Sequence, residues 1–218
     1  MSTIADIAST FEFPKRILPS QPKQLNMGNS ASSTLPALQT VATCEPARMM
    51  GTWFVIGVKP TIFEQTCSNA VEKYTWMEKK GFDVDIDFRY NQNEPIKSKL
   101  KSLPQKGWVQ GNKSNSGEWK VSPMWPIKMP YKIIELDDKN YSYVVIGYPS
   151  RDYCWIMARK PVMEDSLYKS LTNKLVEKHQ YSLDGLRKVP QVWTKGEREK
   201  RGLTQAEIPD KYLVDSLN

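Results

Sequence analysis

The chain has 218 residues, with 31 Lys and Arg against 24 Asp and Glu, which gives a formal net charge of +7. This length suits one domain that buries a full hydrophobic core without disulfide bonds. One histidine and three cysteines far apart in the sequence argue against a zinc or di-iron site, so no bound metal is expected. No stretch approaches the roughly 18 consecutive apolar residues that a membrane-spanning helix needs. The basic surplus suits an anionic partner, whether a fatty acid, an acidic lipid surface or nucleic acid, and does not choose among them.

Residues 1–43 differ in composition from the rest of the chain. They are rich in Ser, Thr, Pro and Gln and show no sustained helical or strand periodicity, which is typical of a leader, linker or disordered arm. Secretion is not expected, because the start of the chain lacks a basic segment followed by an apolar run. We favour a cytoplasmic location. A chloroplast or another organelle is the alternative, since Lys15 and Arg16 suit a transit peptide whereas Asp6 and Glu12 do not.

A short pattern inside this arm matches a lipidation signal. Met27 to Ser32 fit the consensus M-G-x-x-x-[ST] for N-myristoylation, in which Gly28 carries the acyl chain once it is the N-terminus. Two interpretations stay open: a chance match in a Ser-rich segment, or translation that starts at Met27. Because one acyl chain holds a membrane only reversibly, the basic surface would then supply a second contact with an anionic membrane.

Residues 51–160 read as short strands separated by Gly, Pro, Asn and Asp turns, a pattern typical of an antiparallel barrel or sandwich. Phe82, Val84, Ile86 and Phe88 alternate with aspartates and therefore share one strand face. The segments on either side of Pro104 can be one bent strand, which gives the eight strands of a closed up-and-down barrel. The expected strands cover residues 52–58, 69–77, 82–90, 97–102 with 107–111, 118–122, 131–136, 141–147 and 152–159.

One amphipathic helix is expected after Pro161. Leu167, Leu171 and Leu175 fall on one stripe, which we expect to pack on the outside of the barrel. The chain is thus divided into an arm over residues 1–43, a barrel with its helix over 44–193 and a charged, solvated tail over 194–218. The sequence indicates no function for the tail.

Two motifs carry a family resemblance. Gly51-Thr52-Trp53 opens the first strand, and Arg151-Asp152-Tyr153-Cys154-Trp155-Ile156-Met157-Ala158-Arg159 comes before the helix. In this order and spacing they resemble the G-x-W and R-D-Y-x-W-I-x-x-R signatures of lipocalins, and more narrowly the group of apolipoprotein D, bacterial outer-membrane lipocalins and plant temperature-induced lipocalins. The resemblance covers residues 44–193. It implies an all-β fold, an eight-stranded antiparallel up-and-down lipocalin barrel with one C-terminal external α-helix.

The resemblance also implies how the barrel closes, with Gly51, Trp53 and Arg159 as the closure residues. Trp53 would plug one end and Arg159 would lie across its ring, a cation–π contact worth about 1–2 kcal/mol when it is shielded from water. If Arg159 points inward, strand alternation places every second residue before it inside and the others outside, toward the helix. The inward set is Met157, Trp155 and Tyr153, and the outward set is Ile156 and Cys154.

The candidate ligand-binding residues are the large apolar and aromatic side chains expected on the inner face of the barrel. They are Tyr74, Phe82, Val84, Ile86, Phe88, Trp119, Val121, Tyr131, Ile133, Tyr143, Tyr153, Trp155 and Met157. Placing Tyr74 inside also places Glu72 inside, where an unpaired carboxylate is unfavourable. Either Glu72 has an internal partner, such as a Tyr hydroxyl or a Lys, or the expected register is wrong by one residue. We favour the register error.

We expect the barrel to bind and carry or sequester a small hydrophobic ligand, without a cofactor. A fatty acid, lysolipid, sterol, retinoid or carotenoid-like molecule would fit an eight-stranded barrel whose inner side chains leave room. The resemblance adds a role in membrane protection under stress. Contact with an anionic membrane surface and a monomeric state are further expectations. A barrel filled by its own side chains, with a structural or partner-binding role, is the alternative.

An enzymatic alternative rests on Cys67, because some lipocalin-fold proteins are isomerases or de-epoxidases. No base that could activate its thiol is visible, since His179 lies in the outer helix region, so we expect no catalytic residue and no enzyme. Reduced thiols are favoured at Cys44, Cys67 and Cys154, with a single disulfide as the alternative, because the count is odd and an export signal is not apparent.

A nucleic-acid partner is not expected, although Trp108, Trp119 and Trp125 are interleaved with lysines. A groove that binds nucleic acid needs its aromatic side chains exposed on one face of a sheet. In the barrel Trp119 points inward, so the basic cluster reduces to loops.

Overall fold

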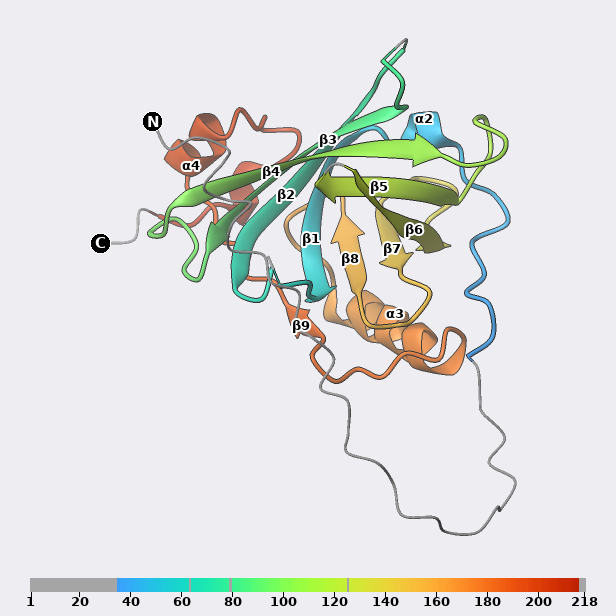
Figure 1. Ribbon diagram of the computed structural model, residues 1–218. Coiled ribbons are helices and arrows are strands. Elements are labelled where there is room, and N and C mark those ends of the chain that lie inside the picture. The colour runs from blue at the N-terminus through green and yellow to red at the C-terminus, as the bar shows by residue number, and fades with distance from the viewer. Residues whose placement is uncertain (1–34, 63, 79, 125, 216–218) are drawn as a thin grey trace, which may run out of the picture. The chain divides into compact units, whose positions relative to one another are not determined.

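The computed structural model describes residues 35–62, 64–78, 80–124 and 126–215. Eight antiparallel strands close into a barrel, in which each strand pairs with the next and β1 pairs with both β2 and β8 (Figure 1). The expected fold class is therefore confirmed. The strands are β1 (Gly51–Lys59), β2 (Cys67–Trp76), β3 (Val84–Gln92), β4 (Leu100–Val109), β5 (Glu118–Met124), β6 (Ile127–Leu136), β7 (Tyr143–Gly147) and β8 (Cys154–Ala158).

Pro104 lies within one continuous strand. β4 runs through it and pairs with β3 along its whole length, with Pro104 opposite Asp87. The two segments read separately from the sequence are therefore one strand, which gives the count of eight. β6 begins at Ile127, earlier than the expected residue 131, because β5 and β6 form a tight hairpin in which Met124 is opposite Ile127.

The expected external helix is α3 (Asp165–Glu177). Its buried Leu171 and Leu175 pack against Cys154 and Ile156 of β8, which face outward from the barrel. His179, just past the helix, is buried with its Nε2 2.9 Å from Glu135 Oε1 of β6. A two-residue strand, β9 (Arg187–Lys188), then pairs with β1 at Val58 and Gly57. It occupies the edge of β1 beyond the stretch that pairs with β2.

Part of the expected arm belongs to the folded unit. Residues 35–43 run along the barrel: Leu38 is buried among the side chains under α3, and the Val41 amide donates to the carbonyl of Ile133. Arg151 donates a hydrogen bond of 2.7 Å to the carbonyl of Pro36. A short helix, α2 (Pro46–Met49), follows before β1. Residues 1–34, with Gly28 and the lipidation pattern, lie outside the described residues.

The C-terminal segment differs from the solvated tail that its charges suggest. Trp193 is fully buried against Phe54 of β1, with ring centroids 5.9 Å apart. The segment continues as α4 (Lys195–Lys200) and a 3₁₀ turn, η1 (Asp210–Tyr212), and Ile208 joins the same outer hydrophobic cluster. The charged side chains of Glu197, Arg198 and Arg201 are buried with partners. The many charged residues of this segment suggested that it is exposed to solvent. Their side chains can be buried because they are hydrogen-bonded to partners.

Candidate functional site in the barrel interior

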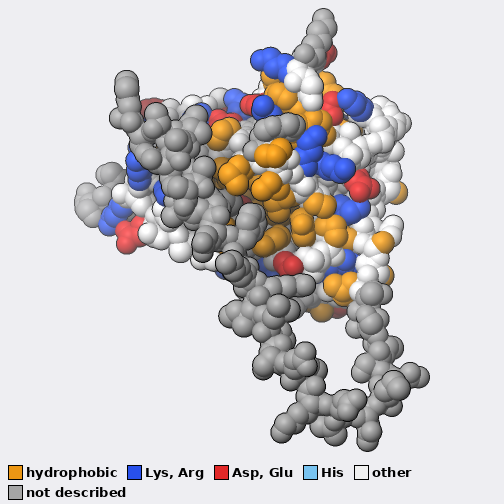
Figure 2. Space-filling model, viewed as in Figure 1, with side chains coloured by type: hydrophobic (Ala, Val, Ile, Leu, Met, Phe, Trp, Pro, Cys, Tyr) orange, Lys and Arg blue, Asp and Glu red, His pale blue; other side chains and the backbone are white. Residues whose placement is uncertain are grey.

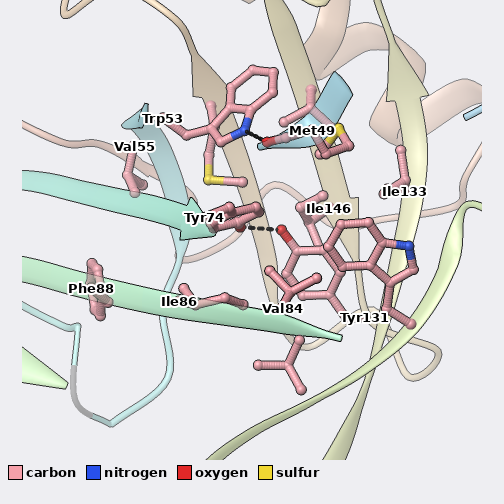
Figure 3. Packing of buried hydrophobic residues seen from close by; sticks show 14 of the residues in the cluster. Met49, Trp53, Val55, Tyr74, Val84, Ile86, Phe88, Tyr131, Ile133 and Ile146 are labelled. Atoms are coloured by element: carbon pink, nitrogen blue, oxygen red, sulfur yellow. Dashed lines mark hydrogen bonds between the residues drawn. The ribbon is translucent and has the colours of Figure 1, made fainter. Parts of the chain in front are cut away.

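The floor of the barrel is sealed by Trp53 and Arg159. The guanidinium carbon of Arg159 lies 3.7 Å from the centre of the Trp53 ring, and the indole Nε1 donates to the carbonyl of Met49 at 2.8 Å (Figure 3). Arg159 also donates to the carbonyls of Tyr141, Thr52 and Arg48. Gly51 has a φ of +95°, and a Cβ at this position would lie 3.3 Å from Arg159 Nη1. The glycine of the first motif therefore leaves room for the arginine of the second.

Above the floor, aromatic and aliphatic side chains of all eight strands form one interior cluster (Figure 3). Trp119 stacks on Tyr131 with ring centroids 5.7 Å apart, and Tyr74 lies 6.3 Å from Trp119. These large rings pack against one another in the lower barrel. The cluster includes Val55, Val58, Val84, Ile86, Phe88, Tyr90, Val109, Val121, Ile133, Val144, Ile146 and Met157.

A polar chain crosses this apolar interior. The Tyr74 hydroxyl donates to Glu72 Oε2 at 2.5 Å, and the hydroxyls of Tyr74 and Tyr131 are 2.5 Å apart. Glu72 is opposite Trp53 on β1 and Phe88 on β3, so it shares their inward face. Burial raises the pKa of Glu72 to about 7, an effect that the Tyr74 hydrogen bond opposes and the charge of Glu64 reinforces. The expected register was therefore correct, and Glu72 has the internal Tyr partner that was the less favoured interpretation.

Trp155 marks the opposite end, the mouth. Its side chain is only half-buried, packs against the interior cluster, and donates from Nε1 to Glu64 Oε1 at 2.7 Å. Glu64 also accepts from the amide and hydroxyl of Thr61, so the loop after β1 is tied to the first residues of β8. Arg187 donates to Cys67 Sγ at 3.2 Å beside this loop.

Some inward side chains above the floor remain partly exposed. Gln105 is opposite the fully buried, inward Ile86, and Leu103 is opposite Phe88. Both are half-buried, as are Met129, opposite Val121, and Trp155. Figure 2 shows hydrophobic side chains gathered in the middle of the viewed face, with Lys and Arg beside them. We call the sealed floor together with this partly exposed upper wall the cup.

A lipocalin-like family model matches residues 45–191, which span the barrel, α3 and β9. The chain belongs to the lipocalin-like family. Temperature-induced lipocalin-1 of Arabidopsis thaliana is 28% identical over 169 residues, which cover 71% of this chain and 83% of that protein. Outer membrane lipoprotein Blc of Vibrio cholerae is 26% identical over 141 residues, which cover 65% and 77%.

A solved structure shows the same lipocalin fold. Insecticyanin from the tobacco hornworm Manduca sexta matches with a TM-score of 0.54 and 14% identity, over 75% of this chain and 88% of that one. At this identity the likeness concerns the fold. Within the described residues no helix is long and apolar enough to cross a membrane.

Most of the candidate lining residues lie inside the lipocalin barrel, and three do not. Phe82 precedes β3 and turns outward, with its ring centroid 6.4 Å from that of Trp108, and both line a surface pocket of about 280 Å³. Tyr143 is opposite Ala158 and packs on the helix side. Tyr153 lies in the loop before β8, 5.4 Å from Tyr148. Phe82 and Tyr153 lie outside the paired strands, where alternation does not hold. Tyr143 lies within β7 and follows its alternation, but on the outward face, because Val144 and Ile146 point inward.

The cysteines of this lipocalin are buried and unpaired. Burial raises the pKa of Cys67 to about 11, against the opposing effect of Arg187, and that of Cys154 to about 12. Thiols in such surroundings stay protonated at neutral pH and are poor nucleophiles. No group of His, Cys, Asp and Glu in the described ranges is placed to hold a metal ion.

Sequence reasoning missed several residues of the interior. Glu64, Tyr90, Leu103 and Val109 line or border it. Tyr90 lies at the end of the expected strand 82–90 and could have been found by continuing the alternation beyond Phe88. Glu64 lies in a loop with no periodic signal, so only the fold shows that it meets Trp155.

Proposed function

We propose that this protein binds a small hydrophobic ligand inside the barrel and carries or sequesters it. The observation that carries the proposal is the cup itself: a floor sealed by Trp53 and Arg159 beneath an apolar wall whose upper residues remain accessible. Each methylene that leaves water for such a wall contributes about 0.8 kcal/mol. A fatty acid, lysolipid, sterol, retinoid or carotenoid-like molecule presents enough apolar surface to bind in this way.

The rim of the cup supports delivery to or uptake from a membrane surface. The loops β1–β2 and β5–β6 lie at the end of the antiparallel barrel opposite Trp53, and they expose Ile62, Met124 and Ile127. Lys97, Lys99 and Lys101, in and after the β3–β4 loop at the same end, are exposed. Apolar side chains beside lysines suit the interface of an anionic bilayer. A monomer that visits such a surface from the cytoplasm fits these features.

The names of two relatives suggest a physiological role for this chain. One is a temperature-induced lipocalin and the other an outer membrane lipoprotein. By extension we propose that this chain protects membranes under stress by holding lipids in its barrel.

Native mass spectrometry of protein purified gently from its own source, with extraction of the bound molecules, tests the proposal. A stoichiometric lipid or pigment is expected, and its mass identifies the ligand class. The mass of the chain also shows whether the mature protein begins at Gly28 with a myristoyl group. An empty barrel that also takes up no lipid on titration would favour the alternative in which Trp119, Tyr131 and Tyr74 complete a filled core with a structural role.

A further inference from the structure

The inner wall of the barrel carries polar groups that a purely apolar ligand leaves unused. Glu72 lies near the floor in contact with Tyr74 and Tyr131, and Glu64 lies at the mouth against Trp155. Glu72 and Tyr131 keep 6% and 8% of their surfaces accessible, although they lie among side chains that are fully buried. These two inward-facing residues therefore keep a small part of their surface accessible.

The direction of the hydrogen bonds determines what the polar chain can still bind. Tyr74 has one hydroxyl proton and gives it to Glu72 Oε2. The proton between the two tyrosines must then come from Tyr131, whose hydroxyl oxygen lies 2.5 Å from that of Tyr74. Within the described residues Glu72 Oε1 has no hydrogen-bond partner, and it is not among the fully enclosed unpaired atoms. The chain of hydrogen bonds from Tyr131 through Tyr74 thus ends at Glu72 Oε1, an accessible acceptor that can bind a hydrogen-bond donor of the ligand.

The charges around this acceptor disfavour a second anion. Glu64 and Glu72 influence each other, and together with burial this raises the pKa of Glu72 to about 7. The nearby cation, Arg159, lies across the Trp53 ring and is held there by hydrogen bonds to three backbone carbonyls. Lys101 is opposite Tyr90 and therefore on the inward face, but it is exposed at the mouth. A carboxylate is thus favoured at the rim and disfavoured at the floor.

We propose that the floor of the cavity is a hydroxyl-binding subsite, formed by Glu72 with Tyr74 and Tyr131, which accepts the alcohol at the leading end of a long apolar ligand and rejects a leading carboxylate. The inference rests on the proposed function, because it requires that a ligand enters the barrel. It narrows the ligand class to aliphatic or isoprenoid-type alcohols, with or without an anionic group at the trailing end.

Three probes that differ only at the leading end test the subsite. Hexadecanoate, 16-hydroxyhexadecanoate and hexadecanedioate share one carboxylate for the rim and end in a methyl, a hydroxyl and a second carboxylate. Titration at pH 8.5, followed by tryptophan fluorescence and calorimetry, is expected to give about tenfold tighter binding for the hydroxyl than for the methyl probe, as one hydrogen bond to a charged acceptor supplies. The dicarboxylate is expected to bind at least about tenfold more weakly than the methyl probe, since it would place two anions together.

Two variants assign the effect to the subsite. Glu72→Gln keeps an acceptor for Tyr74 and removes the charge, so the penalty on the dicarboxylate should fall below about threefold. Tyr131→Phe breaks the polar chain at its other end and should weaken the hydroxyl preference without restoring the dicarboxylate. Glu118→Gln is the matched control, because Glu118 is exposed on β5 and opposite Lys132 on the outer face. It should bind all three probes as the unmodified protein does.

The outcomes separate this inference from the proposed function. If none of the probes binds, the hydroxyl-binding subsite is wrong, and the carrier function is decided separately by the extraction of bound molecules described above. If all three bind with the same affinity, or the dicarboxylate binds best, the carrier function stands and the hydroxyl-binding subsite is wrong. If the preferences hold but Glu72→Gln leaves them unchanged, another group sets the selectivity and the assignment to Glu72 is wrong.

Discussion

The Arg159 guanidinium lies 3.7 Å from the centre of the Trp53 ring, and the two residues close the barrel from its first strand and from the residue directly after its last strand. Arg159 combines this contact with hydrogen bonds to three carbonyls, two of which belong to α2 and β1. The floor therefore links the beginning and the end of the barrel. We expect Trp53 and Arg159 to contribute mainly to stability, whereas the proposed ligand would contact side chains above them.

Arg159→Ala is expected to lower the free energy of unfolding by about 2–4 kcal/mol, through loss of the cation–π contact and of charged hydrogen bonds to buried carbonyls. Ligand affinity in the folded fraction should change less. Thermal unfolding and ligand titration on the same preparation measure both quantities. A variant that unfolds normally but loses binding would reverse the role assigned to Arg159.

Trp155→Ala is expected to weaken ligand binding by about tenfold or more, because it removes a large apolar surface from the upper wall. The fold should persist, since Trp155 is only half-buried. Phe82→Ala is the control: it truncates another aromatic side chain, but one that contacts Trp108 on the outer face. Equal affinity for the Trp155 variant and the unmodified protein would remove Trp155 from the site.

Arg201→Met is expected to destabilise the protein by about 3 kcal/mol, because the buried carboxylate of Glu197 loses the guanidinium hydrogen bond and keeps only the longer ion pair with exposed Lys200. Arg201 also donates to Asn91 Oδ1 and to the carbonyl of Asn69, which ties the C-terminal segment to β2 and β3. Lys195→Met, an exposed substitution on the same helix, should change little. Urea denaturation compares the two, and similar midpoints would show that the C-terminal segment does not support the barrel.

Met124→Asp is expected to reduce binding to phosphatidylserine-containing vesicles by about tenfold, since it replaces an apolar rim residue with an anion. Val176→Asp places the same charge on exposed α3, on the outer face, and should leave vesicle binding close to normal. Co-sedimentation measures both. Equal loss in the two variants would indicate general charge repulsion rather than docking by the rim.

The sequence predicted the strand order and the floor because both depend on local patterns. Trp53 and Arg159 belong to motifs, and alternation within β8 fixes the faces of Trp155 and Ile156. Tyr143 shows where this reasoning ends: its outward face follows from its pairing with Ala158, a long-range register that local alternation does not supply. Trp193 shows a second limit, because one fully buried tryptophan anchors a segment whose composition suggested solvent exposure.

For Glu72, the sequence predicted two alternatives but could not decide between them. The cost of burying a carboxylate indicated either a partner or a register error. The Tyr74 partner is two residues away on the same strand face, but Tyr131 comes from β6, and only the closed barrel brings it to Tyr74. Local sequence therefore raised the question that the tertiary structure answers.

The buried carboxyl of Glu72 also predicts a pH dependence of stability. Its pKa is raised from 4.5 to about 7 in the folded state, so between these values the native protein holds a proton that the unfolded chain releases. The free energy of unfolding should therefore fall as pH rises from about 4.5 to 7, by on the order of 3 kcal/mol from this group. Below about pH 4.5 the carboxyl is protonated in both states, and its contribution no longer changes.

Glu135 acts in the opposite direction at lower pH. Burial alone would raise its pKa, but hydrogen bonds from His179, Lys178 and Lys174 lower it to about 2. Stability from this group is lost as pH falls below about 4.5, so Glu135 and Glu72 act in different pH ranges. Glu72→Gln should be more stable than the unmodified protein at pH 8 and similar to it at pH 5, as measured by urea denaturation at both values. If the free energy of unfolding of Glu72→Gln falls between pH 5 and pH 8 as much as that of the unmodified protein, another buried group titrates in this range.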